Sequence, residues 1–81
     1  MTLTVTRTLD CKGLSCPLPI VKTAQALRQL APGELIEVLA TDPGATKDFA
    51  AWAKATGNAL VETSQDGNVL RFVIQKKGVT R

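Results

Sequence analysis

The sequence predicts a two-layer α/β (α+β) sandwich with the element order β-α-β-α-β-β, in which two helices pack on one face of a four-stranded mixed sheet. The 81 residues, 44% hydrophobic and 21% charged, suit one domain, residues 1–81, with a thin core. Segments with hydrophobic periods of two and of 3.6 residues alternate along the chain. Because a strand–helix–strand crossover is almost always right-handed, both helices can cover one face and leave the other open to solvent.

The first half of the chain predicts a strand, a helix and a second strand. In residues 2–9, threonines alternate with mostly aliphatic side chains, as in a half-buried strand. From residue 18 to residue 30 or 31 the hydrophobic positions follow a helical period, and Pro32-Gly33 then ends the helix. Residues 34–41 are rich enough in aliphatic side chains to predict a strand buried on both faces.

The second half predicts a turn, a helix and a hairpin. Residues 41–46 contain Asp-Pro-Gly, a turn sequence, and a helix that includes residues 48–56 follows. Three side chains share the inner face of this helix and are expected in the core rather than as a base-stacking platform: Phe49, Trp52 and Ala53. Residues 59–63 and 69–75 predict strands joined around an Asp-Gly turn, and residues 76–81 are expected to fray.

Composition limits the possible functions. No segment approaches the ~20 apolar residues of a membrane span, and the first ten residues lack a secretory signal, so the cytoplasm is the expected location. Two cysteines without any histidine provide neither a Cys-His catalytic pair nor a zinc site, so no metal is expected. The net charge of +3 indicates acidic partners and only weakly nucleic acid. Lys76 and Lys77 are expected to be solvated, with a docking patch as the alternative.

The strongest candidate for a reactive site is the segment Cys16-Pro17-Leu18-Pro19, at the expected start of the first helix. Proline is favoured at the first helical position, so Pro17 there makes Cys16 the N-cap. Pro19 then lies in the first turn, where its missing N–H costs no helical hydrogen bond. A thiol at a helix N-terminus feels roughly half a positive charge, which stabilises the thiolate and lowers the pKa. Cys16 is therefore a candidate nucleophile, and an ordinary buried cysteine is the alternative.

Residues near this segment have predicted supporting roles. Gly13 permits an otherwise unfavourable φ in the loop. Lys12 and Lys22 can strengthen the positive field at the thiol. Asp10 would oppose that field if it were close, although a carboxylate at a strand end more often accepts N–H bonds from the loop. Cys11 continues the inward parity of the first strand and is expected to be a packed core thiol.

A motif in this segment resembles one of a known family: Asp10-x-x-Gly13-x-x-Cys16-Pro17-x-Pro19, followed by a helix. The family is that of the TusA sulfur carrier proteins, also called SirA-like. The likeness continues through residues 31–62 and the closing hairpin, so it covers about residues 8–77. The resemblance implies a sandwich similar to the C-terminal domain of translation initiation factor three. It also implies that Cys16 carries a persulfide.

The resemblance further implies partners. A donor protein, either a cysteine desulfurase or a rhodanese-like protein, would load the cysteine, and an acceptor protein would receive the sulfur for sulfur oxidation, tRNA thiolation or cofactor assembly. We expect a monomeric sulfurtransferase that acts as a persulfide carrier, with no cofactor, no membrane contact and no stand-alone catalysis. Two alternatives stay open at this point: an RNA-binding or regulatory module, and a redox switch formed by Cys11 and Cys16.

Overall fold

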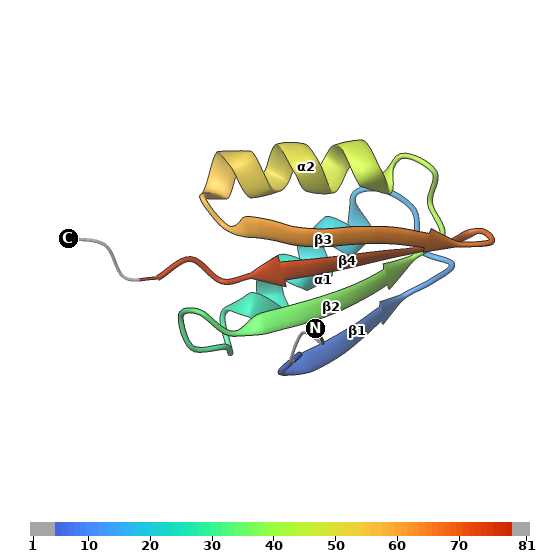
Figure 1. Ribbon diagram of the computed structural model, residues 1–81. Helices are drawn as coiled ribbons and strands as arrows, with labels where there is room; N and C mark the ends of the chain where they lie inside the picture. Colours follow the sequence, from blue (N-terminus) through green and yellow to red (C-terminus); the bar gives the residue numbers. More distant parts are fainter. Residues whose placement is uncertain (1–4, 79–81) are drawn as a thin grey trace.

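A four-stranded sheet covered on one face by two helices makes up the described part of the chain, residues 5–78, in the computed structural model (Figure 1). In chain order the elements are β1 (Arg7–Cys11), α1 (Leu18–Leu27), β2 (Leu35–Ala40), α2 (Ala45–Thr56), β3 (Ala59–Asp66) and β4 (Val69–Gln75). This order and the two-layer arrangement confirm the predicted fold class. No helix within residues 5–78 is long and apolar enough to cross a membrane.

The strand order in the sheet is β1-β2-β4-β3, with β1 parallel to β2 and the other two pairs antiparallel. Because β1 and β2 run in the same direction, the segments that leave their carboxyl ends, residues 12–17 and 41–44, emerge at the same end of the sheet. Each segment leads into a helix, so the amino termini of α1 and α2 also lie there (Figure 1). We call this the helix-start end of the sheet.

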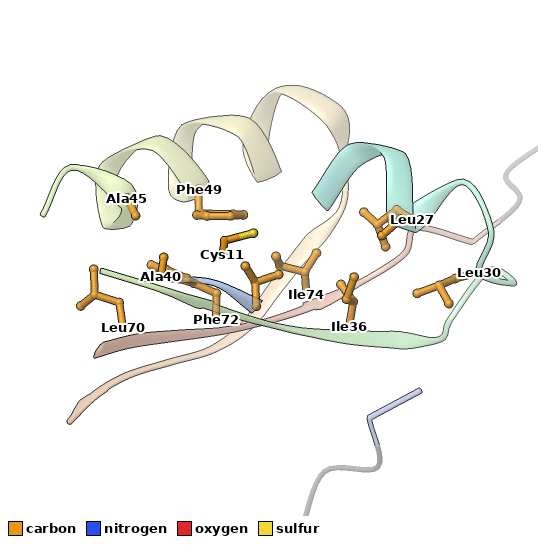
Figure 2. Close-up of a cluster of buried hydrophobic side chains, with 12 residues drawn as sticks. Cys11, Leu27, Leu30, Ile36, Ala40, Ala45, Phe49, Leu70, Phe72 and Ile74 are labelled. Carbon is orange, nitrogen blue, oxygen red and sulfur yellow. The ribbon is translucent and has the colours of Figure 1, made fainter. Parts of the chain in front are cut away.

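The core lies between the helices and the inner face of the sheet (Figure 2). The ring of Phe49 on α2 stacks on Phe72 of β4, with centroids 4.6 Å apart, and meets Trp52 edge-on at 6.0 Å. Phe49 and Ala53 are buried as predicted, whereas Trp52 is only partly buried against the cluster. Cys11 is fully buried, which confirms its predicted place in the core.

The outer face of the sheet differs from the prediction that the second strand is buried on both faces. Inward side chains of β2 are buried and outward ones are only half-buried: Ile36, Val38 and Ala40 against Leu35, Glu37 and Leu39. Because both helices pack on the inner face, outward side chains of the sheet form polar contacts with one another instead. There Arg71 of β4 forms ion pairs with Glu37 of β2 and, at 3.2 Å, with Glu62 of β3.

Element boundaries move by a few residues from those predicted. β1 begins at Arg7, and residues 2–4 of the expected first strand lie outside the described part of the chain. α1 ends at Leu27, because the next three N–H groups bond to carbonyls three residues back, which tightens the last turn. β3 is longer than expected and runs to Asp66.

The end of β4 is better anchored than expected. Lys76 donates a hydrogen bond from Nζ to the carbonyl of Leu30 at 2.6 Å, and the backbone N–H of Lys77 donates to Oδ1 of Asn58 at 2.9 Å. The prediction of fraying from residue 76 is therefore wrong for these two residues. Residues 79–81 lie outside the described part.

Candidate functional site

The loop between β1 and α1 is held by hydrogen bonds to both neighbouring strand ends. Oδ1 of Asp10 accepts the N–H of Lys12 at 3.0 Å, as expected for a carboxylate at a strand end. The N–H of Gly13 donates to Oγ1 of Thr41, which follows β2, at 2.9 Å. Gly13 has a φ of +83°, a left-handed conformation that glycine adopts without the penalty of a Cβ. The loop that leads to Cys16 is thus fixed at the helix-start end.

Cys16 is an exposed free thiol at the end of this loop, whereas Cys11 is a buried free thiol. Strand parity explains the difference, because Cys11 lies opposite Ala40 in the sheet and faces the helices, while Cys16 is already beyond the sheet. Two apolar side chains in the first turn of α1 are also exposed, Leu18 by 45% and Val21 by 42%. The accessible thiol therefore lies beside an apolar surface.

The helix start differs by one residue from the prediction. Pro17 is the N-cap of α1, and its carbonyl accepts the hydrogen bond from the N–H of Val21 at 3.0 Å. The predicted N-cap role of Cys16 is therefore wrong, and Cys16 precedes the cap, joined to Pro17 by a cis peptide bond. Pro19 lies in the first turn, as expected, where it is buried.

Two carboxylates from the β2–α2 connection lie close to the thiol. Asp42 accepts the backbone N–H of Cys16 on Oδ2 at 3.1 Å and the N–H of Gly44 on Oδ1 at 3.2 Å, so it links the two loops. Asp48, in the first turn of α2, hydrogen-bonds to the thiol itself. The site therefore combines a thiol from the start of α1 with acids from the start of α2.

These carboxylates raise the pKa of the Cys16 thiol above its ordinary value of 9.0. The hydrogen bond with Asp48 is the largest cause, followed by partial desolvation and by the negative charges of Asp48 and Asp42. The lowering of the pKa expected from the helix N-terminus is thus outweighed. At neutral pH the free protein holds Cys16 mainly as the protonated thiol.

The predicted contribution of the two lysines to Cys16 is not found in the structure. Neither Lys12 nor Lys22 is among the groups that shift the pKa of this thiol. Burial raises the pKa of Cys11, and it is there that Lys22 acts, in the lowering direction, while Asp10 adds to the rise. The acid that matters at Cys16 is consequently Asp48 and not Asp10.

Sequence reasoning missed Asp42, Asp48 and Thr41 as members of the site. The signal that could have found them is the parallel pairing of β1 with β2, which brings the two following loops together. A strand–helix–strand order predicts such a pair, and every residue after the second strand is then a candidate neighbour of Cys16. The pattern does not say which side chain reaches the thiol.

The fold and the site define a small two-layer α/β protein that presents a single accessible thiol where two helices begin. The family model described as Sulfurtransferase TusA matches residues 7–76. The chain belongs to the TusA family.

Individual relatives agree with this assignment. The chain is similar to the sulfur carrier protein TusA of Allochromatium vinosum, with 47% identity over 68 residues, 84% of this chain and 90% of the relative. The protein of the same name from Pseudomonas aeruginosa is 38% identical over 77 residues, 95% and 98% of the two chains. The crystal structure of a SirA-like protein from Desulfitobacterium hafniense superposes with a TM-score of 0.78, covers 89% of this chain and 99% of its own, and at 24% identity supports the fold alone. The relatives' names support a sulfur carrier role, and with it sulfur transfer in general.

Proposed function

We propose that the protein relays sulfur as a persulfide on Cys16, from a donor protein to an acceptor protein. The observation that supports this proposal most is the exposure of the Cys16 thiol at the helix-start end, while the second thiol of the chain is buried. Asp10, Gly13, Pro17 and Pro19 support the site by fixing the loop and the helix start.

Loading and unloading are two exchange reactions at sulfur. In loading, the Cys16 thiolate attacks the outer sulfur of a donor persulfide, a new S–S bond forms, the S–S bond of the donor breaks, and the donor cysteine leaves as a thiolate. In unloading, an acceptor thiolate attacks the outer sulfur, and Cys16 leaves as a thiolate. Each reaction moves one sulfur atom without net oxidation or reduction, so neither requires a redox cofactor.

The donor, a cysteine desulfurase or a rhodanese-like protein, and the acceptor must both reach the thiol. The exposed side chains of Leu18 and Val21 offer an apolar surface within one helical turn of it. Because both partners need the same small surface, they bind in turn rather than together. A reducing cytoplasm suits this chemistry, since it keeps the unloaded cysteine as a thiol. Sulfur oxidation, tRNA thiolation and cofactor assembly are the routes such a relay can serve.

The test is sulfur loading followed by mass spectrometry of the intact protein. Incubation with a cysteine desulfurase and cysteine should add one sulfur atom to the wild-type protein, and subsequent reduction should remove it. Cys16→Ser should gain no sulfur because its hydroxyl cannot form the persulfide. Cys11→Ser is the matched control and should load like the wild type.

Loading that is lost only in Cys11→Ser would contradict the assignment. The same variants also test the dithiol switch, which requires Cys11 to leave the core and bond to Cys16. Mild oxidation should consume one thiol per chain if the relay proposal holds. Reversible loss of both thiols together would favour the switch.

A further inference from the structure

A second surface lies where both helices finish, at the opposite end of the molecule from the helix-start end (Figure 1). A groove of about 270 Å³ opens there between the ends of α1 and α2 and the segment after β4. Its floor includes Ala24, Leu27 and Trp52, and its rim includes Arg28, Lys76 and Lys77. We call this the basic groove. Neither the sulfur chemistry nor the family motif uses any of these residues.

The basic groove has a net positive charge. None of the described residues that line it is acidic, and none of its three cations takes part in the ion pairs found within residues 5–78. The two helix ends each contribute roughly half a negative charge, about one charge together. Three full positive charges exceed that contribution, so an anionic partner is favoured.

A purely structural role accounts for one of the three cations. Lys76 donates from Nζ to the carbonyl of Leu30, just beyond α1, which is a common use of lysine at a helix C-terminus. Arg28 and Lys77 are exposed, and no side-chain hydrogen bond of either is found among the described residues. These two charges remain available to a partner.

We propose that the basic groove binds an acidic peptide segment of a partner protein. One or two apolar side chains of the segment would rest on Leu27 and Trp52, and its flanking carboxylates would pair with Arg28 and Lys77. The volume of the groove is below the ~300 Å³ typical of small-molecule sites, which suits a side chain or two better than a cofactor. Docking at this end leaves Cys16 accessible, so a partner can be retained while the thiol reacts.

The geometry favours a peptide over RNA. A base-stacking platform presents an open aromatic face next to basic residues, usually on a sheet. Here Trp52 is half-buried between helices, with its ring edge-on to Phe49. Its remaining accessible surface adjoins Leu27 and Ala24, which is an apolar environment suited to an aliphatic side chain.

Trp52 is the only tryptophan in the chain, so its fluorescence reports directly on the groove. The probe is a capped synthetic peptide with a leucine pair between paired glutamates, and the matched probe has glutamines in place of the glutamates. We expect a saturable change in emission with the acidic peptide, weakened by added salt. The glutamine peptide lacks the negative charges and should therefore bind at least about tenfold more weakly.

Charge-reversal variants distinguish binding at the basic groove from a general effect of the protein's net charge. The double change Arg28→Glu with Lys77→Glu should weaken binding of the acidic peptide by about tenfold or more. The control, Lys12→Glu with Lys47→Glu, alters the net charge equally at the helix-start end and should bind like the wild type. Ala24→Leu should weaken binding by filling the floor without changing any charge. Far-UV circular dichroism verifies that each variant is folded.

Equal binding of the two peptides, absence of a saturable signal, or equal weakening by the control pair would each overturn the proposal. Tighter binding of polyuridylate than of the acidic peptide would overturn it in favour of RNA. Cys16→Ser should bind the peptide like the wild type. The result therefore does not depend on the role proposed for the thiol.

Discussion

The two cysteines, five positions apart in the chain, occupy opposite environments. Cys11 ends β1 with its side chain in the core, and Cys16 is exposed after a loop that turns at Gly13. A buried thiol resists both ionisation and access, because desolvation disfavours the thiolate. The geometry of one strand and one glycine turn thus decides which sulfur is available.

The hydrogen bond from Cys16 to Asp48 affects reactivity in two ways. It raises the pKa of the thiol, so little thiolate is present in the free protein at neutral pH, which slows oxidation and unspecific exchange. A thiolate with a higher pKa is also intrinsically more nucleophilic once it forms. We therefore expect Asp48 to keep the unloaded carrier unreactive until a partner displaces or neutralises the carboxylate.

Asp48→Asn should accelerate alkylation of Cys16 by iodoacetamide severalfold near neutral pH. The neutral amide removes the negative charge that raises the pKa, so the thiolate fraction increases. Intrinsic nucleophilicity falls less than that fraction rises, since the Brønsted slope is only about 0.4–0.5. The rate is measured across pH by mass spectrometry resolved for each cysteine, and the midpoint should move to lower pH.

Asp66→Asn is the matched control, because it makes the same isosteric change at an exposed acid that does not act on the thiol. Its alkylation profile should superimpose on that of the wild type. If the Asp48→Asn profile keeps the wild-type midpoint, Asp48 does not set the pKa of Cys16 and has only a structural role at the start of α2. An equal shift in both variants would show that net charge, and not this contact, sets the pKa.

At the scale of elements, the site depends on the contact between two loops. Asp42 binds the N–H of Cys16 and the N–H of Gly44, and Thr41 binds that of Gly13, so the start of α1 is attached to the connection between β2 and α2. This attachment is possible because β1 and β2 end side by side. The position of the thiol is therefore a property of the parallel strand pair as much as of its own loop.

On the outer face of the sheet, ion pairs and hydrogen bonds between charged and polar side chains link the strands. Arg71 on β4 pairs with Glu37 on β2 and with Glu62 on β3, and Glu37 also accepts the hydroxyl of Thr8 on β1 at 2.9 Å. All four strands thus contribute to one polar cluster. The pKa of Glu37 lies below its ordinary value of 4.5, chiefly because of the hydrogen bond from Arg71.

Arg71→Met should lower the free energy of unfolding near pH 7 by up to about 1 kcal/mol, since both partners are partly exposed. A carboxyl group whose folded pKa is lowered stabilises the fold above its unfolded pKa, and this contribution disappears as pH falls through the folded pKa. The difference between wild type and variant should therefore shrink below pH 4.5. Urea denaturation at a series of pH values measures it.

Arg7→Met provides the comparison, because Arg7 donates to the neutral amide of Gln29. Removing its charge should leave the acid dependence of stability unchanged. If the Arg71→Met difference persisted undiminished in acid, the loss would come from packing of the arginine stem and not from the ion pairs.

At the scale of the whole molecule, periodicity was sufficient to predict the fold but not the contacts between loops. The patterns that predicted the helices and strands are local, and the preference for right-handed crossovers correctly predicted that both helices cover one face of the sheet. The N-cap at Pro17 and the end of α1 each depend on which of several neighbouring backbone hydrogen bonds forms within one turn. Composition does not distinguish between these hydrogen bonds. The sign of the pKa shift at Cys16 depends on Asp48, a side chain 32 positions away in the sequence.

Stability of the whole molecule depends on few aromatic contacts, because the chain contains only two phenylalanines and one tryptophan. Phe49 connects α2 to the sheet through its stack on Phe72 and is fully buried. Phe49→Ala should therefore cost about 3–5 kcal/mol, a large share of the ~5–15 kcal/mol that stabilise a typical domain. Urea denaturation followed by circular dichroism measures this loss, with the exposed Val61→Ala expected to stay within about 0.5 kcal/mol of the wild type. A loss for Phe49→Ala no larger than that control would mean that the helical layer is held to the sheet mainly by α1.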